Sequence, residues 1–252
     1  MNGQLHFGYP WWLSYGHLVV AAFAVPLFLL GHARRWPRGR MLVLGSLALW
    51  SSAAFVVARF VLDVNGRAAL PTQDFLASGR GRVLDMGAGT GRSSIMVLEA
   101  RPRAALVALD LFADSYNQHF GTGASPEERL MANLKAAGVD GRAVIRAGDM
   151  RRLPFEPAAF DAIVSAYAID HLDREGVRQC IAEASRVLKP GGEFLLMVIG
   201  KDLWLQFTFG PLLIHAPTRD APWWTSRLRE AGFEVMEHGT RPATLYLLAR
   251  KP

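Results

Sequence analysis

Two long uncharged stretches open the chain, and neither has a polar face. Residues 11–30 carry no formal charge, and residues 41–62 are interrupted by a single arginine. About 20 consecutive apolar residues are enough to cross a bilayer as a helix. Trp11, Trp12 and Trp36 lie near the ends of these stretches, where interfacial aromatic side chains are common. The pattern predicts a helical hairpin that anchors the chain in a membrane. Two core helices of a soluble bundle are the alternative.

The pattern changes after Gly66, where short aliphatic runs begin to alternate with amphipathic helical stretches. This alternation is typical of a mostly parallel β-sheet covered by helices. Ser125 before Pro126 and Gly138 after the same stretch have the positions of an N-cap and a C-terminal glycine. The expected strands are 82–85, 105–110, 143–147, 162–165, 193–199, 233–237 and 244–249, and the expected helices are 91–100, 126–137, 174–188 and 221–231.

The last two expected strands are separated by only six residues, HGTRPA. So short a link cannot hold a crossover helix, so we expect these strands to pair antiparallel at the edge of the sheet. The chain therefore divides into an anchoring helical hairpin, residues 1–66, and an α/β domain with a Rossmann-like sheet of seven strands, residues 67–252.

Basic residues are concentrated near the N-terminus. Before Asn65 the chain carries five arginines and one aspartate, so about two thirds of its net charge of +6 arises there. The remainder is nearly balanced and has no arginine stripe with interleaved aromatic residues, so no nucleic-acid binding is expected. The arginine-rich linker between the two apolar stretches suits phospholipid headgroups.

The single cysteine, Cys180, excludes a disulfide framework and a CxxC-type metal site. Apolar residues recur around it at helical spacing, which predicts a buried structural thiol. The seven histidines are scattered, without ligand-like spacing beside a carboxylate, so no metal is expected.

A glycine-rich turn follows the first strand of the domain and leads into a helix. The strand ends in Asp85, and the turn reads Gly87-Ala88-Gly89-Thr90-Gly91. Glycine allows positive φ angles and close approach to a ligand, and the helix N-terminus that follows offers unpaired N–H groups to an anion. A dinucleotide fingerprint that starts at Gly87 would require glycine or alanine where Arg92 stands, and no P-loop sequence is present.

The segment 82–94 resembles motif I of the class I S-adenosylmethionine-dependent methyltransferases, and later segments continue the resemblance in order. A second strand ends in Asp110 and a third in Gly148-Asp149-Met150. The stretch 153–172 resembles the fourth motif of the quinone-methylase-like subset, and 183–197 resembles the segment that follows it in many small-molecule methyltransferases. The resemblance covers most of the domain and implies S-adenosylmethionine as cosubstrate.

The resemblance also implies which residues bind the cosubstrate. In this family an acid at the position of Asp110 binds both ribose hydroxyls, and a carboxylate suits bidentate hydrogen bonding to a diol. An acid at the position of Asp149 contacts the adenine amino group, and the side chain of Met150 packs on the ring. The implied set is Asp85, Gly87, Ala88, Gly89, Gly91, Asp110, Leu111, Asp149, Met150 and Ser165.

Simpler structural roles stay open for three of these acids. Asp85 also suits a helix N-cap or a turn, Asp110 the end of a strand, and Asp149 a Gly-Asp turn. The sequence KPGG at 189–192 favours a structural turn that leads into the fifth strand.

Methyl transfer is an in-line displacement, and placing the acceptor atom about 3–3.5 Å from the methyl carbon supplies most of the acceleration. A general base is needed only when the acceptor carries a proton of high pKa. Ligands bind at the carboxyl ends of the strands in such sheets. The candidates there are Asp170, His171, His119, Tyr116 and His215, and the resemblance allows His171 a structural role as well.

An aromatic-rich segment, residues 200–224, follows the fifth strand. It contains Trp204, Phe207, Trp223 and Trp224 among few charges. Family members build acceptor-binding caps at this point, and an apolar lid suits an apolar acceptor. The same residues are equally suited to docking the domain onto the anchor or the bilayer.

We therefore expect a membrane-associated methyltransferase that acts on a small hydrophobic acceptor: a quinone-like phenol, a lipid or a thiol. The fourth strand runs into SAYA in place of the NPPY motif of amino-methylating nucleic-acid enzymes, which favours a small molecule. Two other functions stay open: a membrane-tethered module that binds S-adenosylmethionine without catalysis, and a nicotinamide-dependent oxidoreductase.

The basic linker poses a topological conflict. The positive-inside rule places residues 31–40 in the cytoplasm, and two spanning helices would then put the domain outside, away from cytosolic cosubstrate. Either the second helix lies in the interface, or the whole hairpin is monotopic, or the rule fails here. We expect the domain to face the cytoplasm, on a bacterial inner membrane, because the cosubstrate is there.

Overall fold

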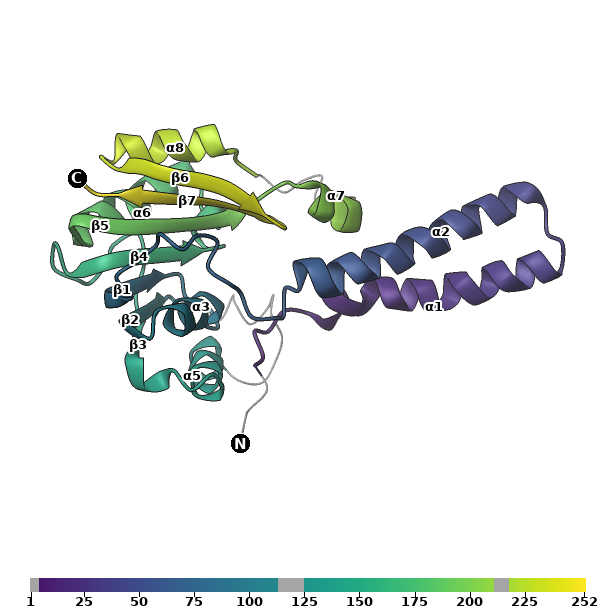
Figure 1. Ribbon diagram of the computed structural model, residues 1–252, viewed down its shortest axis with the longest axis horizontal. Helices are drawn as coiled ribbons and strands as arrows, with labels where there is room; N and C mark the ends of the chain where they lie inside the picture. The colour runs from purple at the N-terminus through teal and green to yellow at the C-terminus, as the bar shows by residue number, and fades with distance from the viewer. Residues whose placement is uncertain (1–4, 113–124, 211–217) are drawn as a thin grey trace. The chain divides into compact units, whose positions relative to one another are not determined.

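The computed structural model describes residues 5–112, 125–210 and 218–252. The chain forms two compact units, both drawn in Figure 1. The hairpin unit comprises Tyr9–Gly66 and Asp202–Ala216, and the domain unit comprises Met1–Gly8, Arg67–Lys201 and Pro217–Pro252. Sequence patterns divided the chain only once, after residue 66. The segment Met1–Gly8, which the sequence assigned to the hairpin, belongs to the domain unit. The segment Asp202–Ala216, which the sequence assigned to the domain, belongs to the hairpin unit.

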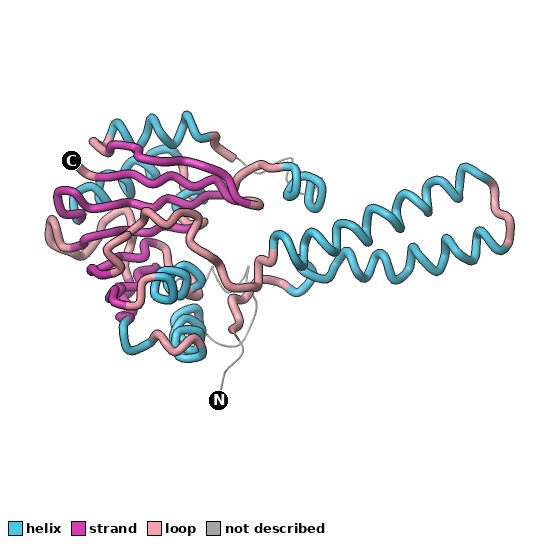
Figure 2. The backbone as a smooth tube through the Cα atoms, in the orientation of Figure 1, coloured by secondary structure: helices cyan, strands magenta, loops and turns pink. Residues whose placement is uncertain are grey.

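The hairpin unit contains two long antiparallel helices, α1 (Trp11–Ala33) and α2 (Arg38–Val56), and α2 continues as a π-helical segment, η1 (Val57–Leu62). Both long helices begin directly after a proline, which fits the first turn of a helix because proline lacks an N–H. The turn between them is tight: a Cβ on Gly31 would lie 2.9 Å from the Met41 sulfur. Figure 2 shows the two helices side by side along their length.

Small or polar residues form the seam between these helices. The buried residues are Ser14, His17, Ala21, Ala24 and Gly31 in α1 and Ala48, Ser51 and Ala54 in α2. The spacing of three and four residues along α1 is the spacing that keeps one face of a helix against its neighbour. The large side chains point outward instead, with Phe23 75% and Leu49 74% exposed. A fourth element, α7 (Leu203–Phe209), also belongs to this unit.

In the domain unit, seven strands of the described residues form one sheet in the order β3-β2-β1-β4-β5-β7-β6. All neighbours pair parallel except β7, which pairs antiparallel with β5 and with β6. The strands are β1 (Arg80–Met86), β2 (Arg103–Asp110), β3 (Ala143–Ala147), β4 (Phe160–Ala166), β5 (Leu188–Ile199), β6 (Glu234–Arg241) and β7 (Thr244–Arg250). The expected Rossmann-like sheet and its antiparallel edge are confirmed.

Helices flank the sheet where the sequence pattern placed them: α3 (Arg92–Ala100), α5 (Pro126–Ala136), α6 (Arg174–Val187) and α8 (Ala221–Glu230), with short 3-10 segments η2 (Asp140–Arg142) and η3 (Ile169–His171). The predicted cap of α5 is present as a capping box between Ser125 and Glu128. Many boundaries differ from the prediction by one or two residues, and two differ by more. β5 begins at Leu188, so it includes KPGG, and β6 extends to Arg241, because both segments pair with β-strand neighbours.

The aromatic segment after β5 separates into unlike parts. Trp224 lies in α8 and is fully buried in the core beside Phe233 and Leu228, and Trp223 packs edge-on against it with a ring distance of 4.8 Å. Trp224 therefore stabilises the core of the domain and cannot form part of an acceptor lid, whereas for the partly buried Trp223 the lid stays a prediction. Trp204 and Phe207 lie instead in α7 of the hairpin unit.

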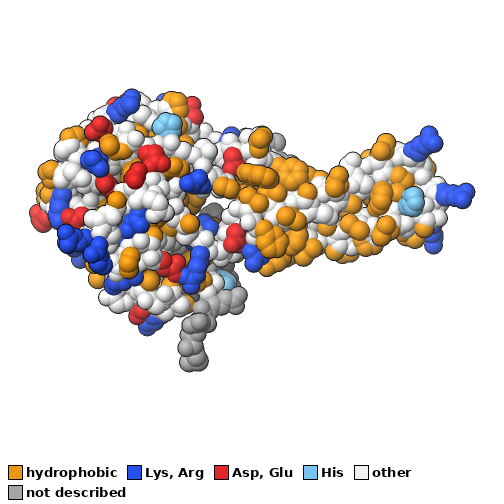
Figure 3. Space-filling view, in the orientation of Figure 1, with side chains coloured by type: hydrophobic (Ala, Val, Ile, Leu, Met, Phe, Trp, Pro, Cys, Tyr) orange, Lys and Arg blue, Asp and Glu red, His pale blue; other side chains and the backbone are white. Residues whose placement is uncertain are grey.

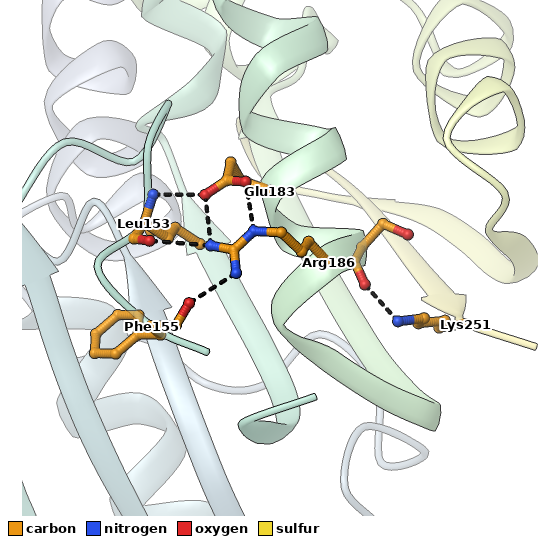
Figure 4. Close-up of polar contacts among 6 residues, drawn as sticks. Leu153, Phe155, Glu183, Arg186 and Lys251 are labelled. Carbon is orange, nitrogen blue, oxygen red and sulfur yellow. Dashed lines mark hydrogen bonds and ion pairs between the residues drawn. The ribbon is translucent and has the colours of Figure 1, made fainter. Parts of the chain in front are cut away.

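A polar network holds the loop after β3 against α6 (Figure 4). Glu183 accepts hydrogen bonds from the Leu153 N–H at 2.7 Å and from the guanidinium of Arg186 at 2.7 Å. Arg186 in turn donates to the carbonyls of Leu153 and Phe155. Hydrogen bonding by Arg186 is the main cause that lowers the pKa of Glu183. The network fixes the loop that begins with Asp149 and Met150, two predicted cosubstrate residues.

We expect Glu183→Gln to lower the melting temperature at pH 7 by about 2–4 °C, the shift that corresponds to about 1 kcal/mol in a chain of this size. A carboxylate whose pKa is lowered by folding stabilises the fold above its unfolded pKa, and this stabilisation disappears as pH falls. The difference between variant and wild type should therefore close in acid. Thermal denaturation in detergent from pH 7 to pH 3 measures it.

Glu175→Gln is the matched control, because Glu175 also pairs with an arginine three residues away on α6 but is exposed. No measurable loss is expected there, since exposed pairs contribute little. Equal losses in both variants, or a loss at Glu183 that persists at pH 3, would contradict a role for the network.

Candidate active site

The glycine turn joins the carboxyl ends of β1, β2 and β4. The N–H groups of Gly87 and Ala88 both donate to the Leu109 carbonyl, at 2.9 and 3.0 Å. Gly87 has a φ of +86°, and a Cβ there would lie 2.3 Å from the Cβ of Ala168. A side chain at Gly87 is therefore excluded by both conformation and space. The turn, which we call the glycine cradle, therefore packs as bare backbone against the end of β4.

Asp85 is fully buried at the end of β1, directly before this turn. Its Oδ2 accepts hydrogen bonds from the hydroxyls of Ser93 at 2.7 Å and Ser94 at 2.6 Å. Its Oδ1 is buried and accepts none from the residues that the structure describes. Burial raises the pKa of Asp85 to about 6, although the two serines oppose the shift. The alternative of a helix N-cap is wrong, because Gly91 has that position in α3.

Asp110 ends β2 beside the turn. Its Oδ2 accepts from the Gly89 N–H at 2.9 Å, and its Oδ1 accepts from the Phe112 N–H at 3.1 Å. The two backbone donors fix the carboxylate, and each oxygen keeps a further lone pair for a ligand hydroxyl. Leu111 is more than half exposed next to it and offers an apolar surface. Asp110 and Leu111 together therefore suit a ribose diol that carries a flat ring.

Asp149 and Met150 follow β3 on the other side of the turn. The methyl carbon of Met150 lies 3.8 Å from the position that a Cβ on Gly87 would take, so this side chain reaches the cradle. Asp149 holds Arg151 in a bidentate ion pair, whose shortest distance is 2.7 Å, and this contact is the main cause that lowers the pKa of Asp149. The adenine contact of Asp149 stays a prediction, because a guanidinium faces its carboxylate here.

Ser165 departs from its predicted role. It is fully buried in β4, and its hydroxyl donates to the Met86 carbonyl at 2.7 Å. The contact links the ends of β1 and β4 behind the turn. We assign Ser165 to holding the site together, because its one hydroxyl proton is used in this contact.

Two of the five candidate catalytic residues lie in or beside η3. Asp170 accepts from the Ile199 N–H at 3.1 Å through Oδ2, and its Oδ1 is buried without a hydrogen-bond partner among the described residues. His171 is exposed, and only its backbone N–H has a hydrogen bond here, to Ala168. Tyr116, His119 and His215 lie outside the described residues. Asp170 is thus the candidate whose carboxylate is fixed at the carboxyl edge of the sheet with one oxygen available.

A buried hydroxyl pair at the same edge was not predicted. Tyr167 follows β4 with a φ of +54°, a conformation that side-chain-bearing residues seldom adopt, and its hydroxyl forms a short hydrogen bond with Thr244 at the start of β7. Burial raises the pKa of the Tyr167 hydroxyl. The sequence signal was an aromatic residue with a polar tip at the end of a core strand. Its partner is 77 positions away, so no local pattern could find the pair.

The N-terminal segment of the domain unit crosses the glycine turn, which sequence reasoning also missed. The Thr90 hydroxyl donates to the Phe7 carbonyl at 2.9 Å. Asn133 of α5 is buried; its Oδ1 accepts from the His6 N–H at 2.8 Å, and its amide donates to the carbonyls of His6 and Thr90. Phe7 is itself almost fully buried. The N-terminal segment therefore packs against the cradle and is held there by the buried amide of Asn133. No pattern in the sequence indicated this role of Asn133.

Comparisons with known proteins agree with this geometry. Residues 83–192 match the family model described as a methyltransferase domain. A ubiquinone/menaquinone biosynthesis C-methyltransferase from Rhizobium leguminosarum is 34% identical over 116 residues, which cover 46% of this chain and 40% of the relative. A malonyl-[acyl-carrier protein] O-methyltransferase from Methylococcus capsulatus is 31% identical over 122 residues, covering 48% of this chain and 38% of the relative. The chain thus spans less than half the length of these curated relatives.

A solved structure shares the fold. The 1,6-didemethyltoxoflavin-N1-methyltransferase of Burkholderia thailandensis, which was solved with its substrate and S-adenosylhomocysteine, superimposes with a TM-score of 0.51 at 23% identity and covers 69% of this chain and 73% of that chain. The glycine cradle, the two fixed acids and the family match coincide in one segment. Residues 83–192 therefore match a methyltransferase domain, and the glycine turn and both acids lie within the matched residues.

Proposed function

We propose that the whole protein is a membrane-anchored enzyme that transfers the methyl group of S-adenosylmethionine to a small hydrophobic acceptor. The observation that carries the proposal is the cradle at Gly87, flanked by Asp85 with an unpaired buried oxygen and by the fixed carboxylate of Asp110. These residues match three parts of such a cosubstrate. The ammonium group suits Asp85, the ribose diol suits Asp110, and the adenine ring suits the apolar side chains of Leu111 and Met150.

S-adenosylmethionine supplies an activated methyl group on a sulfonium sulfur. The chain's own residues then have to position the acceptor and, for an acceptor with an O–H or acidic C–H, receive a proton. Asp170 is suited to that second task, because the Ile199 N–H fixes one carboxylate oxygen and leaves the other available. A thiol acceptor would react as the thiolate and would not need this group.

The packing of the hairpin supports a membrane anchor. A pair of soluble helices would bury its large apolar side chains, whereas this pair buries alanine, serine and glycine and exposes phenylalanine and leucine. Small residues at the seam are typical of helices that pack within lipid. Both helices are long and apolar enough to cross a membrane, and only 22% of each apolar window is buried. Figure 3 shows the hydrophobic side chains covering the hairpin and basic side chains gathered at its turn.

The quinone-biosynthesis relative favours a small acceptor with apolar character, and the malonyl relative shows that the matched domain serves other acceptors too. One is named for ubiquinone and menaquinone biosynthesis, and another for methylation of a malonyl group on acyl-carrier protein. Isoprenoid quinones and lipids dissolve in membranes, so an acceptor of this kind would explain why a methyltransferase domain is joined to an anchor. A quinone-like phenol, a lipid or a hydrophobic thiol are the classes to test.

We propose that the domain faces the cytoplasm of a bacterial cell, where the cosubstrate is made. Since α2 packs along α1, the arrangement in which α2 alone lies flat in the interface loses its support. The two helices therefore either both span the bilayer or both enter it from one side without crossing it. The turn with Arg34, Arg35 and Arg38 then departs from the positive-inside rule.

Calorimetric titration with S-adenosylhomocysteine tests the site. Asp110→Ala should weaken binding by about 30-fold or more, equivalent to about 2 kcal/mol, because the diol loses charge-assisted hydrogen bonds. Asp140→Ala is the control, since Asp140 is an exposed acid of η2 in the same domain. Absence of binding by the folded wild type would refute the cosubstrate assignment. Binding would justify screening phenols, lipids and thiols for methyl transfer.

The raised pKa of Asp85 predicts pH-dependent binding. Because the free carboxyl has a pKa of about 6, it is mostly neutral at pH 5 and mostly charged at pH 7, and a cationic ligand group favours the charged form. Affinity for S-adenosylmethionine should rise about fivefold over this range if binding lowers the pKa by about one unit. Asp85→Asn should bind weakly with a flat profile. Identical pH profiles in the two proteins would show that Asp85 does not meet the ammonium group.

Cysteine accessibility in intact cells tests the topology. Asp140→Cys places a thiol on the domain, and Gly39→Cys places one in the hairpin turn, where a Cβ meets no atom within 4 Å among the described residues. An impermeant maleimide should label the domain only after the membrane is opened. Labelling of Asp140→Cys in intact cells would place the domain outside.

A further inference from the structure

The short helix α7 is built into the hairpin unit although it directly follows β5. Asp202 begins it, and the Asp202 carboxylate accepts from the Leu205 N–H at 2.8 Å. Leu205, Thr208 and Phe209 are buried within the unit. The opposite face is apolar and exposed: Leu203 is 81%, Trp204 48% and Phe207 42% exposed. No charged side chain lies within the helix.

Two side chains of the hairpin hold the C-terminal end of α7. The indole N–H of Trp50 in α2 donates to the Phe207 carbonyl at 3.0 Å, and Nε2 of His17 in α1 lies 3.0 Å from the Thr208 carbonyl. A carbonyl can only accept, so His17 carries its proton on Nε2. The last carbonyls of a helix have no partner within it, and leaving them unpaired away from water is costly. The hairpin thus supplies hydrogen-bond donors to two carbonyls at the end of α7.

We propose that α7 lies in the membrane interface with Leu203, Trp204 and Phe207 in contact with lipid acyl chains. This inference rests on the proposed membrane anchor. The exposed face of α7 continues the apolar surface of two helices long enough to cross a bilayer, and the arginines at the hairpin turn complement phospholipid headgroups. Helices with one apolar face and little charge lie along such interfaces, and tryptophan is enriched there.

The lengths along the hairpin agree with this placement. From His17 to the end of α1 there are 16 residues, and from Trp50 back to the start of α2 there are 12. Since a helix rises 1.5 Å per residue, the two residues that hold α7 lie about 18–24 Å along the helix axes from the arginine turn. A helix that lies in the interface sinks about 5–10 Å into it. Together these lengths match a hydrocarbon core of about 30 Å, so the arginines reach the opposite headgroups when α7 lies at the near boundary.

The test uses the full chain in vesicles of phosphatidylethanolamine and phosphatidylglycerol, with an environment-sensitive NBD label on a single added cysteine. The native Cys180 is buried, and burial raises the pKa of its thiol to about 12, so it stays unlabelled. Leu203→Cys reports on α7, and Phe23→Cys reports on the exposed face of α1. Met236→Cys is the matched control, since Met236 is a large apolar residue of the domain with an exposed fraction of 47%.

We expect the labels at 203 and 23 to be blue-shifted and quenched by doxyl-labelled lipids, and the label at 236 to behave as in water. If the label at residue 23 is quenched and the label at residue 203 is not, the proposed membrane anchor is supported but α7 does not contact lipid. A blue shift at 203 without lipid quenching would show that a second copy covers this face, which also overturns the inference. If neither label is quenched, both the proposed membrane anchor and the proposed placement of α7 are refuted.

Discussion

The close approach of Gly87 to Ala168 is the contact on which the rest of the site depends. The turn after β1 can pass the end of β4 only because residue 87 has no side chain. Once it passes there, both of its first N–H groups reach the Leu109 carbonyl at the end of β2. Three strand ends are thereby fixed to one another. The carboxylates of Asp85, Asp110 and Asp170 take their positions from those ends, so their geometry follows from backbone packing.

The buried polar groups around this contact divide into two kinds. Some hold the scaffold and are fully paired, such as the Ser165 hydroxyl on the Met86 carbonyl and the Asn133 amide that binds the N-terminal segment. Others keep an oxygen unpaired among the described residues, as Asp85 and Asp170 do. A protein tolerates an unpaired buried oxygen at a cost, so such groups concentrate where a ligand completes the pairing. Asp85 and Asp170 are therefore the residues at the sheet edge whose pairing a ligand could complete.

The hairpin and the domain bury different kinds of side chain. In the domain, large aliphatic and aromatic side chains fill the core, and in the hairpin the same side chains face outward over a seam of alanine, serine and glycine. One chain thus carries both patterns, and the change between them falls near residue 66. Helix α7 follows the second pattern, with an apolar outer face and its terminal carbonyls satisfied from within its own unit.

Local patterns determined a large part of this protein. The alternation of strands and helices, the glycine turn, the cap at Ser125 and the two apolar helices were all predicted, because each depends on residues close together in the sequence. Pairing across the sheet decided where β5 begins and how far β6 extends, and the packing of α8 decided that Trp224 fills the core. The Tyr167–Thr244 pair, the Asn133 contacts and the attachment of α7 through His17 and Trp50 join residues 43 to 191 positions apart. Only the tertiary structure could decide these, because the free energy of a hydrogen bond depends on a partner that no local window of sequence contains.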